Sequence, residues 1–267
     1  MASSEQHLGL TLANELAAQG RTGFTFAEAQ ACVNLSPTAT ANLLKRMVTD
    51  GLVDKVRRGH YVLRPLGVLG TPSVAEDVAL AVRAAFGDTP HRLAYRTALY
   101  EHDLITHPLR SIQVATTKRT RSETLSGWPL RAVVEPEAEL RIGSMRWNGT
   151  SMSDLERALL DAAHRPSLVG GVEVLVEAVA AASSRVDVDT LTQYARQLKR
   201  SAALRRIGSI ADALDIDGLA QQLKPLSTPT SDIDLEPGTD QKTVWRDARW
   251  RLRWSHTVDE LQAIAEQ

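Results

Sequence analysis

The side chains best suited to molecular recognition lie close together near the start of the chain. If residues 37–49 form a helix, the advance of 100° per residue separates an apolar side from a polar side that carries Thr38, Asn42, Lys45 and Arg46. Asn and Arg can pair bidentately with adenine and guanine edges in the major groove of DNA. We expect Asn42 and Arg46 to read bases, with Thr38 and Lys45 assisting.

A basic turn follows this helix. Arg57 and Arg58 precede Gly59, and His60 begins the next segment. We expect Arg57, Arg58 and His60 to contact the backbone or the minor groove of DNA. Residues 37–64 contain six basic and two acidic side chains, so this segment carries a net charge of +4.

The surrounding elements are suited to presenting these side chains. A first helix is expected to end near Gly20, and Thr25 and Glu28 have the spacing of a capping box for a short second helix. After a turn of three residues, Ser36 and Pro37 are typical of the start of a third helix. Strands over 52–56 and 60–63 complete a predicted winged helix-turn-helix DNA-binding domain at residues 1–66. A polar helix face is also compatible with simple solvation, and winged helices also bind proteins.

Composition limits what the rest of the protein can be. The chain has 31 Lys and Arg against 32 Asp and Glu, and its net charge of -1 excludes a wholly basic nucleic-acid coat protein. A single cysteine, Cys32, can form neither an intramolecular disulfide nor a thiolate cluster for zinc. We expect a cytoplasmic protein with no membrane segment, no metal and no cofactor.

Residues 67–267 are predicted to form a mixed α/β domain, which makes the fold class α+β. A Pro- and Gly-bounded junction covers residues 65–72, and Ser73 and Glu76 form a second potential capping box. A small sheet is expected from four segments, and helices are expected elsewhere. The strand segments are 111–115, 130–134, 140–142 and 145–147, and the helices include 93–102, 172–182 and several within 187–223.

A predicted helix that begins near Ser153 carries acidic residues that could form a catalytic metal site. Ser153 and Glu156 have capping-box spacing, and Asp154, Arg157 and Asp161 share one side as an Asp-Arg-Asp ladder. Asp154, Glu156 and Asp161 could hold a metal in a nucleic-acid-processing enzyme, but Arg157 already supplies a cation between the carboxylates. We favour the structural ladder and expect no enzyme activity.

Two further basic segments are candidate surfaces for a partner or a nucleic acid. The first is a loop that carries Lys118, Arg119 and Arg121. The second is residues 249–254, whose strict alternation predicts a half-buried strand with its tryptophans inward and Arg249, Arg251 and Arg253 outward. Three guanidinium groups on one face repel one another unless a counter-charge is near.

Residues 24–63, FTFAEAQACVNLSPTATANLLKRMVTDGLVDKVRRGHYVL, resemble the N-terminal winged helix of AbiEi-type antitoxins from abortive-infection toxin-antitoxin pairs. Segments 95–108, 111–122, 153–179 and 202–214 resemble, in order, the C-terminal antitoxin domain of that family. The resemblance implies a bacterial protein that binds its own promoter, which we expect to contain inverted repeats. It also implies that the protein represses its operon and counters an AbiEii-type nucleotidyltransferase toxin. A stand-alone winged-helix regulator with a ligand or oligomerisation domain is the alternative.

Overall fold

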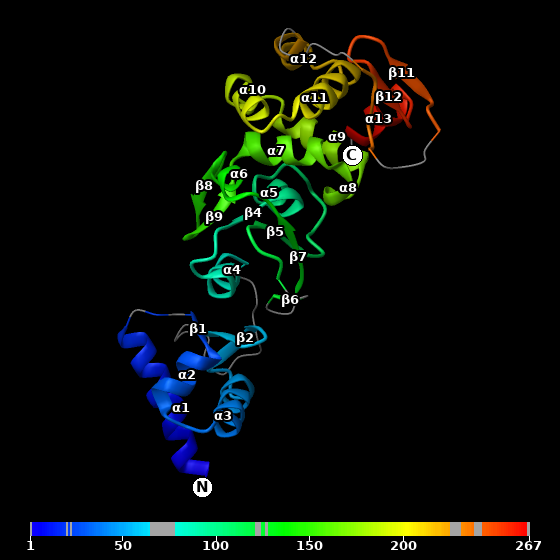
Figure 1. The fold of residues 1–267 in the computed structure, drawn as a ribbon. Coiled ribbons are helices and arrows are strands. Elements are labelled where there is room, and N and C mark those ends of the chain that lie inside the picture. The colour runs from blue at the N-terminus through cyan, green and yellow to red at the C-terminus, as the bar shows by residue number, and fades with distance from the viewer. Residues whose placement is uncertain are drawn as a thin grey trace.

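The computed structural model describes residues 2–19, 21, 23–64, 78–120, 124–125, 128–224, 231–237 and 242–265. Within these residues the protein is a mixed α+β fold with thirteen helices and three sheets (Figure 1). The predicted junction at 65–72, the Ser73 and Glu76 pair, and Arg121 lie outside the described residues. None of the described helices is long and apolar enough to cross a membrane.

The described residues before residue 65 form three helices and a three-stranded sheet. The elements are α1 (Ala2–Ala18), β1 (Gly23–Thr25), α2 (Phe26–Val33), α3 (Pro37–Thr49), β2 (Val53–Arg57) and β3 (His60–Leu63). Both bonds of the capping box between Thr25 and Glu28 are present, and Ser36 caps α3. The sheet has the order β1-β3-β2, and β1 had no counterpart among the predicted strands.

A core of its own holds this N-terminal unit together. It joins α1, α3 and the sheet through Leu12, Phe24, Leu44, Met47 and Val53, each of which is at most 3% exposed. Phe24 and Tyr61 stack across the sheet with ring centroids 5.6 Å apart. The packing fixes which side of α3 faces inward.

A six-stranded mixed sheet forms the middle of the molecule. Its strands lie in the order β6-β7-β5-β4-β9-β8, with β4 parallel to β9 and β5 parallel to β7. The elements of this region are α4 (Val78–Phe86), β4 (His91–Leu93), α5 (Tyr95–Glu101), β5 (Ile112–Thr116), β6 (Thr124–Leu125), β7 (Trp128–Val134), α6 (Glu137–Arg141), β8 (Ser144–Trp147) and β9 (Thr150–Ser153). The strand predicted at 140–142 is wrong, because α6 occupies most of it and buries Leu140 in the core.

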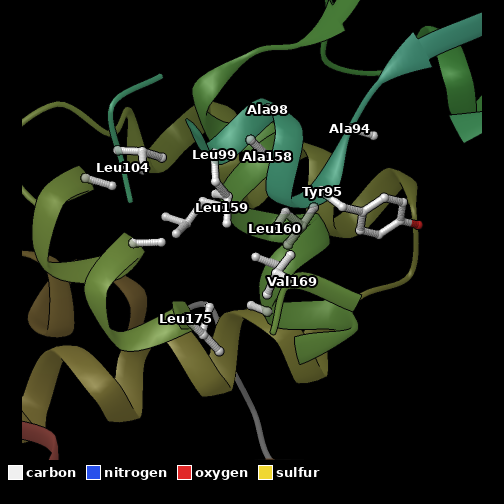
Figure 2. Close-up of a cluster of buried hydrophobic side chains, with 14 of the residues drawn as sticks. Ala94, Tyr95, Ala98, Leu99, Leu104, Ala158, Leu159, Leu160, Val169 and Leu175 are labelled. Atoms are coloured by element: carbon white, nitrogen blue, oxygen red, sulfur yellow. The ribbon is translucent and has the colours of Figure 1, made fainter. Parts of the chain in front are cut away.

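A group of helices lies on the side of this sheet away from the N-terminal unit (Figure 1). They are α7 (Leu155–His164), α8 (Pro166–Val169), α9 (Val172–Ala182), α10 (Val188–Gln197), α11 (Ser201–Ala213) and α12 (Asp217–Leu223). Figure 2 shows Leu99 of α5, Leu159 and Leu160 of α7, Val169 of α8 and Leu175 of α9 meeting in one buried cluster. The predicted Ser153 cap is wrong, since Ser153 belongs to β9 and the side chain of Asp154 caps α7.

The C-terminal region adds a small sheet and a last helix. It contains β10 (Ile233–Asp234), β11 (Trp245–Asp247), β12 (Leu252–Trp254) and α13 (Val258–Ala265). The strand predicted at 249–254 is only partly correct, because Arg251 has a left-handed φ of 49° and the strand begins at Leu252. Trp250, Leu252 and Trp254 point inward as predicted, each at most 1% exposed.

Helix α4 connects the N-terminal unit to the central sheet. Val56 of β2 and Val62 of β3 belong to the same buried cluster as Ala81 and Val82 of α4. His60 adds a polar contact, with its Nδ1 atom 3.2 Å from the carbonyl oxygen of Ala84. The N-terminal unit therefore packs directly onto the rest of the protein.

Candidate functional site

The polar side of α3 faces solvent over its whole length. Thr38, Asn42, Lys45 and Arg46 are all exposed, whereas Leu44 and Met47 on the opposite side are at most 2% exposed. The predicted division of α3 into an inner and an outer face is thereby confirmed. The outer face presents an amide, a hydroxyl and two cations on one rigid element.

Local hydrogen bonds fix the position of α3. Ser36 accepts a bond from the backbone amide of Ala39 at 3.3 Å, and Pro37 begins the helix without losing a donor. Asn34 takes a left-handed conformation with φ of 48°, which turns the chain sharply between α2 and α3. Arg46 donates from Nε to the carbonyl oxygen of Asn42 at 3.4 Å, so these two residues lie next to each other.

The β2–β3 hairpin supplies further basic residues. Gly59 has φ of 76°, which allows a tight turn, and Lys55 and Arg58 are exposed beside it. Arg64 and Asp54 join the two strands through an ion pair of 2.8 Å, and Arg64 is only 8% exposed. The side chain of Arg57 lies outside the described part of the chain.

His60 does not join the exposed basic set. It is half-buried at the start of β3, and its contact with Ala84 turns it toward α4. The structure therefore places Thr38, Asn42, Lys45 and Arg46 on one face and gives His60 a contact between the N-terminal unit and α4.

A second concentration of charge lies inside the larger unit. Asp161 of α7 is fully buried and is paired with Arg92 at 3.0 Å, with Arg157 at 2.7 Å and with Arg200. Glu135 accepts hydrogen bonds from Arg92, from Arg157 and from the hydroxyl of Tyr95. Burial acts to raise the pKa of Asp161, but the three arginines overcome it and hold that pKa below its usual range.

The carboxylates proposed for a catalytic metal do not share an open site. Asp154 accepts bonds from the backbone of Arg157 and from the Tyr194 hydroxyl, both at 2.8 Å, and Glu156 accepts from the backbone of Asp187 at 2.9 Å. The ladder hypothesis foresaw the Arg157–Asp161 pair but not that both side chains are fully buried. In the described ranges, no group of three or more His, Cys, Asp or Glu residues could hold a metal ion.

The three arginines near the C-terminus have counter-charges within the chain. Arg249 pairs with Asp212 at 2.7 Å, Arg251 with Asp232 at 2.9 Å and Arg253 with Asp234 at 2.7 Å. Sequence reasoning missed these aspartates because they lie 19 or 37 positions away from their partners, with no local pattern to connect them. In the other predicted basic surface, Lys118 and Arg119 are exposed after β5.

The cysteine and two of the histidines occupy structural positions. Cys32 lies 2.9 Å from the carboxylate of Glu15, and burial together with that carboxylate raises the pKa of the thiol to about 11. His102 is the C-cap residue that follows α5, and its ring bonds the carbonyl oxygen of Ser153; His164 is the last residue of α7. A thiol that stays protonated at pH 7 is a poor nucleophile.

Comparison with known proteins extends the fold assignment. The crystal structure of the RV2827C protein from Mycobacterium tuberculosis superposes with a TM-score of 0.71 at 14% sequence identity. The match covers 98% of this chain and 95% of that one, so it includes both the N-terminal and the larger unit. No family model and no curated protein matches the sequence. At this identity the likeness establishes a shared fold alone.

Proposed function

We propose that this protein is a DNA-binding transcriptional regulator whose residues 1–66 act as a winged helix-turn-helix. The observation that carries the proposal is the exposed polar face of α3, with Thr38, Asn42, Lys45 and Arg46 on a helix fixed by Ser36 and by its buried side. The three helices and the β1-β3-β2 sheet support this assignment because they supply the recognition helix and the wing that such a domain needs.

In the proposed complex, α3 enters the major groove. Asn42 and Arg46 are one helical turn apart and read neighbouring bases, while Thr38 and Lys45 contact the edges or phosphates. Arg57 and Arg58 contact the DNA backbone from the β2–β3 turn. Because the whole chain has a net charge of -1, the electrostatic attraction to DNA must come from the basic groups of this face.

We further propose that the regulator is an antitoxin of the AbiEi type, acting in the bacterial cytoplasm. The support is the resemblance of residues 24–63 and of four ordered segments in the larger unit to that family. Under this proposal the protein binds inverted repeats in its own promoter, represses its operon and counters a nucleotidyltransferase toxin. Exposed Lys118 and Arg119 remain the better candidates for a partner surface, because Arg249, Arg251 and Arg253 already pair within the chain.

Substitutions on α3 test the DNA-binding proposal. Arg46→Ala and Asn42→Ala should each weaken binding to the protein's own promoter by about 1–3 kcal/mol, or roughly fivefold to 150-fold, in an electrophoretic or fluorescence titration. Binding to a scrambled duplex should change much less. Arg196→Ala, at an exposed position of α10, is the matched control. Unchanged promoter affinity in both α3 variants would remove α3 from base recognition.

Co-expression tests the antitoxin proposal separately. A nucleotidyltransferase encoded beside this gene should arrest growth when expressed alone, and the full-length protein should restore growth from an unrelated promoter. If the Arg46→Ala variant, which should bind the promoter weakly, also restores growth, then toxin neutralisation does not depend on repression of the operon. Absence of such a neighbouring gene, or failure to rescue, would leave a stand-alone regulator.

A further inference from the structure

An open cavity of about 630 Å³, lined by both polar and apolar groups, lies between the end of α4, the helix α6 and the β8–β9 hairpin. Its walls come from three separate parts of the chain, represented by Arg83, Arg141 and Arg146. The cavity is distinct from the outer face of α3 and lies within the size range of small-molecule sites. None of the proposed DNA-contacting residues lines it.

Two of these arginines have no partner in the described part of the protein. Arg83 on α4 and Arg146 on β8 are exposed, and neither forms an ion pair or a side-chain hydrogen bond with another described residue. Within the described ranges, Arg141 is paired only with Glu137, one helical turn away on α6, at 2.5 Å. An exposed pair of this kind is worth at most about 0.5 kcal/mol, so Arg141 can exchange this partner for a ligand.

The position of Arg83 depends on a glycine in the facing hairpin. Gly149 has φ of 77°, and a Cβ atom built there would collide with the guanidinium of Arg83. The guanidinium therefore lies directly over the hairpin turn. This close approach brings Arg83 to the same cavity wall as Thr150 and Ser151.

His91, which also lines the cavity, is held in place by its neighbours. The ring of His91 is held between the carbonyl oxygen of Thr89, 2.8 Å from Nδ1, and the hydroxyl of Thr150, 3.0 Å from Nε2. It also stacks on Phe86, with ring centroids 5.2 Å apart. Burial lowers the pKa of His91, which keeps the ring neutral at pH 7 and leaves the arginines as the cationic groups of the site.

We propose that this cavity binds a small molecule that carries phosphate groups. Guanidinium groups from α4 and β8 can each hold a phosphate in bidentate fashion, and the hydroxyls of Ser144 and Ser151 add donors. Asp88 and Glu137 at the same cavity can accept bonds from hydroxyl or amino groups of the ligand. The volume exceeds that needed for inorganic phosphate and suits a ligand as large as a nucleotide.

The cavity lies one helix away from the N-terminal unit. A neighbouring cavity of about 580 Å³ shares Arg83 and the turn after α4, and reaches Thr25 and His60. The residue after Arg83 is Ala84, whose carbonyl oxygen contacts His60. A ligand held by Arg83 therefore binds α4 next to the residue through which α4 contacts the N-terminal unit.

Calorimetric titration of the full-length protein tests the proposal. The probes are sodium pyrophosphate and ATP, with citrate as a polyanion that lacks phosphate. We expect saturable binding of one equivalent of pyrophosphate or ATP. The double variant Arg83→Gln, Arg146→Gln should weaken it roughly tenfold or more, because both charge-assisted contacts are removed. The matched control Arg196→Gln should bind as the wild type does.

The following results would each overturn the proposal. They are no saturable binding of either phosphate compound, binding of citrate alone, and binding that the double variant leaves unchanged. Loss of ligand binding in Arg46→Ala would also overturn it, since the phosphate would then occupy α3. Promoter titrations are independent of this experiment, so its failure leaves the proposed DNA binding intact. Both substituted arginines are exposed, and circular dichroism with thermal unfolding checks that the double variant is folded.

Discussion

At the scale of single residues, Asp161 is a carboxylate that is fully buried in the larger unit. Its carboxylate is removed from solvent and depends on Arg92, Arg157 and Arg200 for compensation. Removing one member of a buried ion cluster leaves the remaining charges incompletely compensated. The cluster also joins β4, α7 and the residue that precedes α11, so its loss affects several elements at once.

Asp161→Asn should lower the free energy of unfolding by about 3–5 kcal/mol, because three buried cations lose their shared anion. Urea denaturation at pH 7 measures this loss. Glu137→Gln is the matched control, since it breaks an exposed Arg–Glu pair and should cost about 0.5 kcal/mol or less. Equal effects of the two substitutions would contradict a central role for the buried cluster.

The lowered pKa of His164 predicts how the free energy of unfolding changes in mild acid. Burial, together with the charges of Arg200 and Arg165, lowers the pKa of His164 to about 4. Between pH 6.5 and 4 the unfolded chain binds a proton at this residue that the folded protein does not, so stability falls as pH falls through this range. His164→Gln should flatten this part of the profile of thermal midpoint against pH. An identical slope in wild type and variant would contradict the assignment. The stability that the lowered pKa of Asp161 provides is lost only at lower pH, below the unperturbed pKa of 3.8.

At the scale of elements, the helix α11 owes its position to a glycine. Gly208 faces the fully buried ring of Trp250, and a Cβ atom there would collide with that ring. Trp250 in turn is fixed by a hydrogen bond from its indole nitrogen to Asp212. The absence of a side chain at Gly208 is therefore required for the C-terminal turn to pack on α11.

Gly208→Ala should destabilise the protein by about 1–3 kcal/mol through overpacking, although alanine is normally the better helix former. Gly218→Ala in α12 is the matched control, because nothing lies within 4 Å of a Cβ atom built there. It should be neutral or stabilise by up to about 1 kcal/mol. Chemical denaturation of both variants measures the difference, and a stabilised Gly208→Ala variant would show that Trp250 can move.

Local sequence signals predicted some elements well and others poorly. The starts of α2 and α3 follow from Thr25, Glu28 and Ser36, whose hydrogen bonds involve residues only three positions away. The segment 140–142 was misread as a strand, since burial of Leu140 depends on the distant sheet. The outer face of α3 was predictable from helical periodicity. The cavity beside α4 was not predictable, because Arg83 and Arg146 are brought together only by the folding of the chain.

At the scale of the whole molecule, α4 joins the two units into a shared core. Val56 and Val62 of the N-terminal sheet are 2% and 4% exposed and belong to the cluster that contains α4. Figure 1 shows α4 between that sheet and the six-stranded sheet. The proposed DNA-binding unit is therefore stabilised in part by its contacts with α4.

A fragment of residues 1–64 should be less stable than a fragment of residues 1–86, which retains α4. Exposing Val56 and Val62 costs roughly 3 kcal/mol in total at the usual value for burying a valine. Thermal unfolding of the two fragments, with binding of a hydrophobic dye as a second readout, measures the difference. Equal midpoints and equal dye binding would show that the N-terminal unit needs no support from α4.

The most direct test of the central claim is a titration of the full-length protein onto the DNA immediately upstream of its own gene. A scrambled duplex of the same length is titrated in parallel, at two salt concentrations. We predict binding about a thousandfold tighter to the native sequence, with an affinity that falls with salt as a few phosphate contacts require. Equally weak binding to both duplexes would contradict DNA recognition by α3.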